Sequence, residues 1–169
     1  MTNNASILSL EDRVNLYRQA FPKFAELRIF NGRIDSGWIL GNDYRNTSGY
    51  YGAYPNAYLK RVMAMFPDKN KILHLFSGKL PAGNYERFDC NELSGAEHIG
   101  DAHQLEELLG SERYDLILAD TPYSIEDAEH YGTSMIKRNT VLAECRKILE
   151  PGGHLVWLDQ VCPQYSKEN

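Results

Sequence analysis

Four residues in the second half of the chain, Asp120-Thr-Pro-Tyr123, have the types and spacing to bind an amino group. They come directly after residues 115–119, a short and almost wholly apolar run that predicts a buried strand. Ligands of open α/β sheets bind just outside such strand ends, where Asp120 would offer a hydrogen-bond acceptor and Tyr123 a flat ring. The pattern favours a planar substrate with an amino group. An ordinary proline turn with a surface tyrosine would give the same residues.

Three other predicted strands end in a small or acidic residue. The first, residues 71–78, ends in a turn of small residues, where Gly78 lets the backbone approach a ligand closely. The other two are short strands that end in Asp89 and Asp101. After a glycine turn, two such carboxylates can serve the ribose hydroxyls and the amine of an adenine nucleoside. The alternative is that both are ordinary surface acids.

Aromatic and basic residues alternate before these strands. Five of the eleven tyrosines lie within fifteen residues, beside Arg45, Lys60 and Arg61. They are Tyr44, Tyr50, Tyr51, Tyr54 and Tyr58. Such rings can stack on bases or on a cofactor's adenine while the cations pair with phosphates. The alternative is a loop that amphipathic rings hold against the domain.

Apolar periodicity and turn signals predict one α/β domain over residues 1–169, with an N-terminal helical and tyrosine-rich segment (1–70) and a sheet core (71–160). The predicted helices are 9–21, 58–66, 103–109 and 134–150, and the predicted strands are 71–78, 86–90, 97–102, 114–119 and 154–159. The connections 77–85 and 91–96 are short for a crossover with a helix. Either these crossovers lack helices, or the first two strands form a hairpin.

Composition limits the classes of function. A hydrophobic content of 43% and a charged content of 24% are typical of soluble globular proteins, and no run approaches the ~20 apolar residues of a membrane span. The first residues lack the features of a secretory signal, so we expect a cytoplasmic protein. Cys90, Cys145 and Cys162 lack the spacing of a zinc site and predict reduced thiols.

The charge is distributed unevenly along the chain. The net charge is −5, but residues 1–71 carry ten Lys/Arg against six Asp/Glu (+4) and residues 72–169 carry eight against seventeen (−9). A phosphate-binding surface would therefore come from the first half. A chance split of surface charges would look the same.

Three motifs in a fixed order carry a family resemblance. They are His74-Leu-Phe-Ser-Gly78, Asp120-Thr-Pro-Tyr123 and Leu149-Glu-Pro-Gly-Gly153 before a strand. Together they resemble the class I S-adenosylmethionine-dependent methyltransferases. More narrowly, they resemble the amino-methyltransferases of nucleic acids with an Asp-Pro-Pro-Tyr motif that phages and mobile elements carry. The resemblance spans residues 44–160.

The resemblance implies an enzyme with a Rossmann-like, mostly parallel sheet that binds S-adenosyl-L-methionine and methylates an exocyclic amine of a base. N6 of adenine in DNA is the favoured target, and an RNA base or the cytosine amine is the alternative. For a phage-encoded protein the compartment would be the host cytoplasm. The residues that the resemblance assigns to the cofactor are Tyr54, Pro55, Phe76, Ser77, Gly78, Asp89, Asp101 and Ala102.

The same resemblance assigns roles to the Asp120 motif. The Asp120 carboxylate and the Thr121 carbonyl would accept the two hydrogens of the amine, and the nitrogen lone pair would then face the methyl group. After Pro122, the ring of Tyr123 would stack on a flipped base. This chemistry needs no metal.

The chain departs from the family pattern in three places. Thr121 replaces a proline, Leu80 replaces a common glycine, and the chain ends before the hairpin of the last two family strands, leaving about five. The strand at 154–159 would then be an apolar edge, which we expect a second copy, another chain or the N-terminal segment to cover. Two alternatives follow: a truncated, catalytically weak cofactor-binding or interaction module, and a small-molecule methyltransferase.

Overall fold

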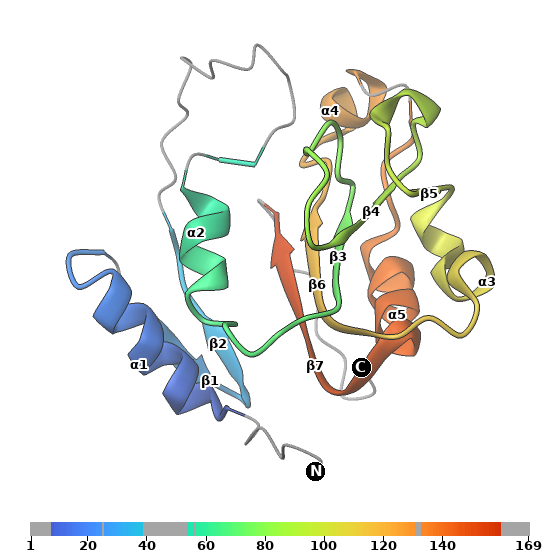
Figure 1. Cartoon of the computed structure of the whole chain (residues 1–169). Coiled ribbons are helices and arrows are strands. Elements are labelled where there is room, and N and C mark those ends of the chain that lie inside the picture. Colours follow the sequence, from blue (N-terminus) through green and yellow to red (C-terminus); the bar gives the residue numbers. More distant parts are fainter. Residues whose placement is uncertain (1–7, 25, 39–53, 56, 131–132, 160–169) are drawn as a thin grey trace. The chain divides into compact units, whose positions relative to one another are not determined.

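The computed structural model describes residues 8–24, 26–38, 54–55, 57–130 and 133–159. The chain divides into two compact units, Met1–Lys69 and Asn70–Asn169. Figure 1 labels the helices and strands of both units.

The N-terminal unit begins with helix α1 (Leu10–Ala20), which starts and ends where the sequence predicts. The Ser9 hydroxyl accepts a hydrogen bond from the Asp12 amide at 3.1 Å, and the Asp12 carboxylate accepts one from the Ser9 amide at 3.0 Å. This reciprocal capping box satisfies amide groups that a helix start leaves without partners. The predicted helix is confirmed.

A small hairpin follows α1. Strand β1 (Arg28–Phe30) pairs antiparallel with β2 (Arg33–Asp35). Asn31 and Gly32 both have positive φ values, 48° and 72°, as a two-residue hairpin turn of this kind requires. The Asn-Gly pair therefore suits the turn of this hairpin.

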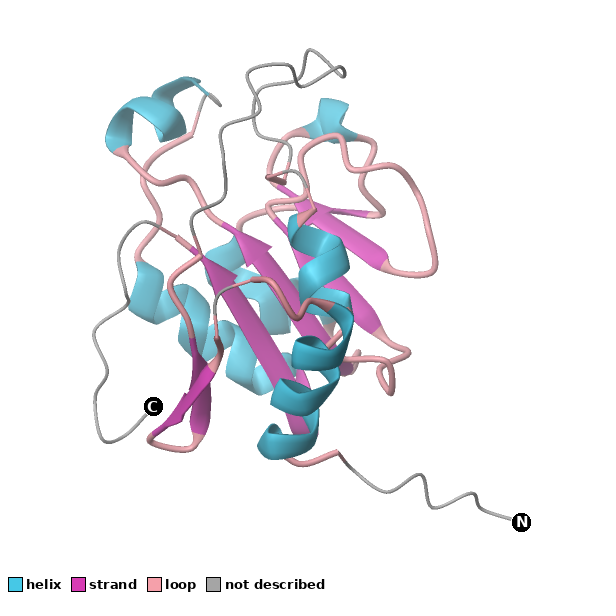
Figure 2. Cartoon of the chain, turned by 90° about the vertical axis from the view of Figure 1, so that its left-hand side faces the viewer, coloured by secondary structure: helices cyan, strands magenta, loops and turns pink. Residues whose placement is uncertain are grey.

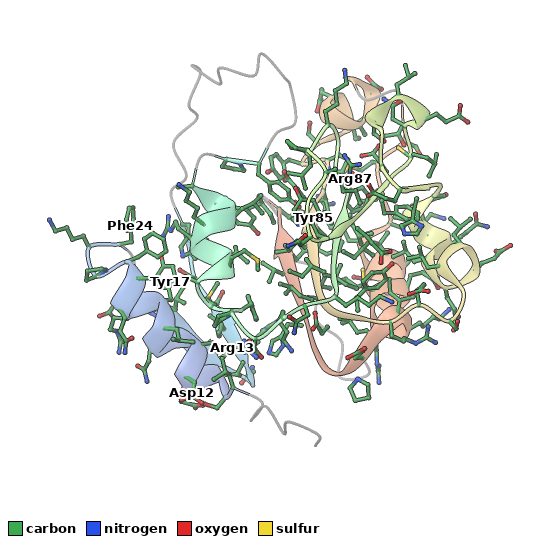
Figure 3. All side chains as sticks on the ribbon, viewed as in Figure 1. Asp12, Arg13, Tyr17, Phe24, Tyr85 and Arg87 are labelled. Carbon is green, nitrogen blue, oxygen red and sulfur yellow. The ribbon has the colours of Figure 1, made fainter. Side chains whose placement is uncertain are left out.

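A buried arginine links α1 to the end of the N-terminal unit. The Arg13 guanidinium donates two hydrogen bonds to the Asp68 carboxylate, at 2.7 and 2.8 Å, and one to the Met65 carbonyl at 2.8 Å. Arg13 projects from α1 in Figure 3. Because its side chain is fully buried, this paired geometry offsets the loss of hydration of the charge.

The C-terminal unit is built on five parallel strands in the order β5-β4-β3-β6-β7. Figure 2 draws the strands of the chain in magenta. They are β3 (Ile72–Leu75), β4 (Glu86–Asp89), β5 (His98–Ile99), β6 (Tyr114–Asp120) and β7 (Leu149–Leu158). The chain passes outward from β3 to β5 and then returns to the other side of β3, an order compatible with a Rossmann-like fold. The predicted α/β class is confirmed.

The first two crossovers of this sheet lack an α-helix. Strands β3 and β4 are parallel, with Leu73 beside Glu86. Residues 76–85, all within the described ranges, contain no helix, and the connection from β4 to β5 holds only a 3₁₀ turn, Glu92–Ser94. The alternative of crossovers without helices is confirmed, and the alternative of a hairpin is wrong.

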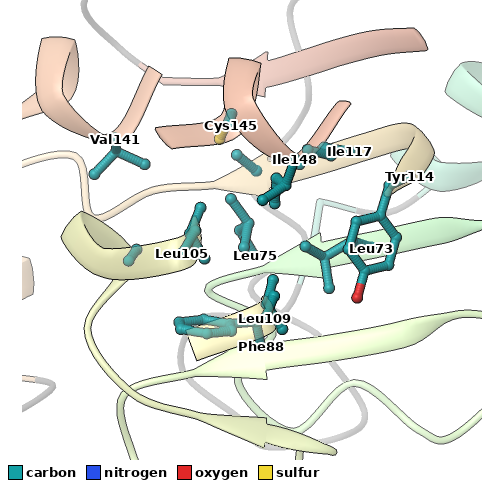
Figure 4. Close-up of a cluster of buried hydrophobic side chains, with 12 residues drawn as sticks. Leu73, Leu75, Phe88, Leu105, Leu109, Tyr114, Ile117, Val141, Cys145 and Ile148 are labelled. Atoms are coloured by element: carbon teal, nitrogen blue, oxygen red, sulfur yellow. The ribbon is translucent and has the colours of Figure 1, made fainter. Parts of the chain in front are cut away.

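Two helices, α3 (Leu105–Leu109) and α5 (Arg138–Ile148), pack against one face of the sheet. Alternate residues of β3 and β6 face them, since successive strand residues point to opposite faces. The main members of this core are Leu73, Leu75, Phe88, Leu105, Leu109, Tyr114, Ile117, Val141, Cys145 and Ile148 (Figure 4). Each fully buried aliphatic side chain contributes about 1.5–3 kcal/mol, so this core fixes the direction of the strands that end at the candidate site.

The last helix ends earlier than predicted. α5 stops at Ile148 and β7 begins at the next residue, so the predicted helical end at 150 is wrong. Strands β6 and β7 lose register between Tyr114 and Leu116, where residues 150–153 bulge out. Gly153 is needed there, because a Cβ would lie 2.9 Å from the Glu150 carbonyl oxygen. The Pro-Gly-Gly sequence therefore forms a bulge inside the strand.

Strand β7 is the outer strand of the described sheet. That another chain or the N-terminal segment covers this edge stays a prediction.

A short helix that the sequence did not predict, α4 (Ile125–His130), follows the Asp120 motif. None of the helices in the described ranges has the length and apolar character needed to span a membrane.

Candidate active site

The strand order brings two predicted site segments together. β3 and β6 are neighbours, and Leu75 lies beside Ala119 in their register. The chain continues from β3 to one side of the sheet and from β6 to the other, so the strand order reverses between them. Ligands of such sheets bind in the crevice outside the carboxyl ends of the strands at this point. Phe76 and Asp120 are the next residues on these adjacent strands.

Asp120 is the last residue of β6 and is partly buried. Its Oδ1 accepts a hydrogen bond from the Tyr123 hydroxyl at 2.8 Å. Burial raises the pKa of the Asp120 carboxyl from 3.8 to about 7, the charge of Asp159 acts in the same direction, and the Tyr123 hydrogen bond acts in the opposite direction. This carboxyl can therefore accept a hydrogen bond when ionised and exchange a proton near neutral pH.

A second buried carboxylate, Asp159, holds the turn that follows Asp120. Its side chain is 2% exposed and accepts hydrogen bonds from Arg138 at 2.6 and 3.0 Å, from the Thr121 hydroxyl at 2.9 Å and from the Trp157 indole at 3.2 Å. We call Asp159, Arg138, Thr121 and Trp157 the Asp159 cluster. The Thr121 amide also donates to the Leu158 carbonyl at 3.4 Å. Sequence reasoning singled out neither Arg138 nor Asp159.

The turn after β3 contains two residues in the left-handed region of backbone conformation. Phe76 and Gly78 both have positive φ values, 57° and 53°. The Gly78 amide donates to Asp89 Oδ2 at 2.7 Å, and the Asn91 amide donates to Oδ1 of the same carboxylate at 2.9 Å. Asp89 therefore joins the turn after β3 to the end of β4, beside the candidate crevice.

Ser77 provides a test of whether this turn fits a polar cofactor. The residue is buried, and its hydroxyl has no hydrogen-bond partner among the described residues. A buried hydroxyl without a partner is unfavourable, so a polar ligand group at this turn would satisfy it. The residues of the turn thus fit the amino-acid or sugar end of S-adenosyl-L-methionine.

One arginine links the loops on either side of β4. The Arg87 guanidinium donates to the Leu80 carbonyl at 2.6 Å, to the Gly95 carbonyl at 2.6 Å and to the Glu97 carboxylate (Figure 3). This arginine lowers the pKa of the Glu97 carboxyl to about 2. Leu80 contributes its backbone carbonyl to this network.

Asp101 lies in the connection after β5, because this strand ends at Ile99 and the predicted strand end at residue 102 is wrong. Its Oδ1 accepts hydrogen bonds from the amide and Nδ1 of His103, at 2.9 and 2.5 Å. Nε2 of the same ring accepts the Lys137 amide at 2.9 Å, so the hydrogen of the neutral imidazole lies on Nδ1. Ala102 is buried beside Asp101. The carboxylate is exposed, and its predicted role toward the adenine amine of a cofactor stays a prediction.

Part of the tyrosine-rich stretch packs inside the N-terminal unit. Tyr54 stacks on Tyr58, with ring centroids 5.5 Å apart. From α2 (Tyr58–Met63), Arg61 donates to the Tyr17 hydroxyl and lies 4.0 Å from the centre of the Trp38 ring. Arg61 is therefore part of an aromatic core and is not a phosphate ligand in this arrangement.

Other members of that stretch lie outside the described residues, namely Tyr44, Arg45, Tyr50 and Tyr51. Tyr54 and Pro55 belong to the N-terminal unit, whereas the other predicted cofactor residues belong to the C-terminal unit. Their role in closing the pocket stays a prediction.

Comparison with known proteins adds no identification: no protein-family model matches the chain, and no curated protein matches its sequence. Within the described ranges, no group of three or more His, Cys, Asp or Glu side chains is arranged to hold a metal ion. The residues at the carboxyl ends of the neighbouring strands β3 and β6 are therefore the basis of the functional proposal.

Proposed function

We propose that the protein is an S-adenosylmethionine-dependent methyltransferase that acts on an exocyclic amino group of a nucleic-acid base, with N6 of adenine in DNA as the first choice. One observation carries the proposal. Asp120 ends β6 beside the turn of Phe76, Ser77 and Gly78 that ends β3, and the strand order reverses between them. The proposed amine acceptor and the proposed cofactor-binding turn therefore follow neighbouring positions at one edge of the sheet.

In this proposal the turn after β3 binds the cofactor, which supplies a methyl group on a sulfonium. Ser77 would donate to a polar group of the cofactor, Asp89 would hold the ribose hydroxyls, and Asp101 would accept the adenine amine. The two oxygens of Asp89 each accept one backbone amide, which fixes their direction and leaves further lone pairs for hydroxyl donors. Orientation of the reacting groups supplies most of the rate enhancement.

Asp120 would orient the substrate amine and receive its proton. In the structure the Tyr123 hydroxyl occupies Asp120 Oδ1, so the incoming amine would replace that donor. The ionised carboxylate and the Thr121 carbonyl would then accept the two amine hydrogens. Because the pKa of Asp120 is about 7, the same carboxyl can take up the proton that the nitrogen releases.

A transfer assay tests the proposal directly. Purified protein is incubated with methyl-labelled S-adenosylmethionine and with unmethylated plasmid DNA, total RNA or no nucleic acid, and the modified base is identified by mass spectrometry. We expect label in DNA as N6-methyladenine, and loss of label in Asp120→Ala but not in Asp35→Ala, a change at an exposed carboxylate of β2. Transfer that persists in Asp120→Ala would remove the role given to Asp120. Transfer without any nucleic acid would favour a small-molecule substrate.

A second candidate is a cofactor-binding module without catalysis. Two observations favour it: the acceptor oxygen of Asp120 already holds the Tyr123 hydroxyl, and residues 72–169 carry eight Lys/Arg against seventeen Asp/Glu, which opposes nucleic-acid binding. Calorimetry separates the candidates. Binding of S-adenosylmethionine without binding of a DNA duplex would support the module, and binding of both would support the enzyme.

A further inference from the structure

The Asp159 cluster joins three separate segments at the end of the sheet. Arg138 comes from the first residue of α5, Thr121 from the turn after β6, and Asp159 from the residue after β7. The Asp159 side chain is 2% exposed and the Arg138 side chain is 20% exposed. A buried carboxylate is retained only when donors satisfy it, and here four hydrogen bonds from three side chains do so.

The cluster acts on the residue next to Asp120. Thr121 is buried and is held twice, through its hydroxyl to Asp159 and through its amide to the Leu158 carbonyl. A proline at this position would stiffen the turn through its ring but could supply neither bond. In this chain the two hydrogen bonds from Thr121 to Leu158 and Asp159 restrain the turn instead.

We propose that Asp159 and Arg138 are positioning residues for methyl transfer: Arg138 orients Asp159, and Asp159 holds the Thr121 turn so that the Asp120 carboxylate faces the crevice between β3 and β6. This inference rests on the proposed function. It assigns roles to two residues that lie outside all three sequence motifs.

The charges around Asp120 make its pKa a test of the inference. This pKa would not change if Asp159 and Arg138 only stabilised the fold. Tyr123 and Asp159 face Asp120, and Arg138 faces Asp159. Asp159→Asn removes a neighbouring negative charge and should lower the pKa of Asp120. Arg138→Gln leaves the Asp159 charge without its cation and should raise it. The two variants therefore shift the pKa of Asp120 in opposite directions, although both weaken the same ion pair.

The experiment combines carboxyl titration with kinetics on the full chain. The ¹³C resonance of the Asp120 carboxyl, assigned with Asp120→Asn, is followed from pH 4 to 9 in the wild type, Asp159→Asn and Arg138→Gln. Methyl transfer from S-adenosylmethionine to unmethylated plasmid DNA is measured in the same variants and in Thr121→Val and Thr121→Ser. We expect kcat to fall about tenfold or more in Thr121→Val, with KM for the cofactor within about twofold, because a hydrogen bond to a charged group is lost at the turn.

Thr121→Ser keeps the hydroxyl and should recover most of the rate lost in Thr121→Val. If Asp159→Asn fails to fold, the comparison of these two Thr121 variants still tests the inference. Equal kcat in the Val and Ser variants would overturn the inference, as would an unchanged pKa of Asp120 in both charge variants. If the opposite pKa shifts are found but the wild type transfers no methyl group to any acceptor, the positioning of Asp120 is supported and the methyltransferase proposal itself fails. The two failures are therefore distinguishable.

Discussion

Replacement of Asp120 by asparagine should stabilise the folded protein at neutral and alkaline pH. In the folded chain the pKa of this carboxyl is raised from 3.8 to about 7, chiefly by burial. Between these two pH values the unfolded chain releases the proton while the folded chain keeps it. The wild type therefore loses stability as the pH rises from 4 to 7, whereas asparagine carries no charge to be buried.

The size of the effect follows from the pKa difference. Each pKa unit is worth about 1.4 kcal/mol, so a rise from 3.8 to about 7 corresponds to a loss of about 4 kcal/mol above pH 7. We take this as an upper limit, because solvent reaches part of the side chain. An asparagine at this position would also differ from aspartate in its hydrogen bonds, but that contribution is the same at every pH. Urea unfolding followed by circular dichroism at pH 4, 6 and 8 gives the free energy of unfolding of both proteins.

The test compares the free energy of unfolding of the variant with that of the wild type and follows how their difference changes with pH. We expect Asp120→Asn to gain stability over the wild type from pH 4 to pH 8, while the exposed Asp35→Asn serves as a control for the removal of one carboxylate. A difference that is constant with pH, or one that moves in favour of the wild type, would show that Asp120 is not held in a charge-disfavouring site. That result would refute the reasoning without reference to enzymatic activity.

Three further predictions concern other contacts. Tyr123→Phe removes the hydrogen bond that lowers the pKa of Asp120, so the acid limb of the pH profile of kcat/KM should move about one pH unit to the alkaline side. Asp68→Asn leaves the buried Arg13 without its counterion and should lower the free energy of unfolding of the N-terminal unit by about 3 kcal/mol, measured by urea unfolding. Leu75→Ala opens a cavity in a fully buried position and should lower the stability of the C-terminal unit by about 2–5 kcal/mol in the same assay.

The positions of the strand ends could be predicted from the sequence because each strand is a local signal. An apolar run that stops at an acid marks both a buried strand and its carboxyl end, which is how Asp120 was found. The strand before Asp89 is a weaker signal, because it is short and carries Glu86 and Arg87. Their arrangement in space follows from a general rule for parallel sheets, in which carboxyl ends share one edge. Proximity of the Asp120 motif to Gly78 could thus be expected before any coordinates.

The features of the fold and of the site that could not be predicted depend on contacts between residues far apart in the sequence. Arg138 and Asp159 are 21 positions apart, and nothing local marks them as a pair, although an acid directly after the last strand was an available signal. The bulge at residues 150–153 was missed because Pro-Gly-Gly after a helix usually ends the helix, and here pairing with β6 begins first. The absence of crossover helices left two alternatives, which only strand pairing could separate.

The guanidinium of Arg87 ties together two connections that differ in sequence and length. Leu80 lies in the loop that precedes β4 and Gly95 lies in the loop that follows it. The Leu80 carbonyl accepts from one terminal nitrogen of this guanidinium and the Gly95 carbonyl from the other. Any insertion in either loop would displace a carbonyl and leave a buried cation short of acceptors, so the two loops are not free to vary in length independently. An engineer who wished to add the missing helix between β3 and β4 would first have to supply Arg87 with a new acceptor.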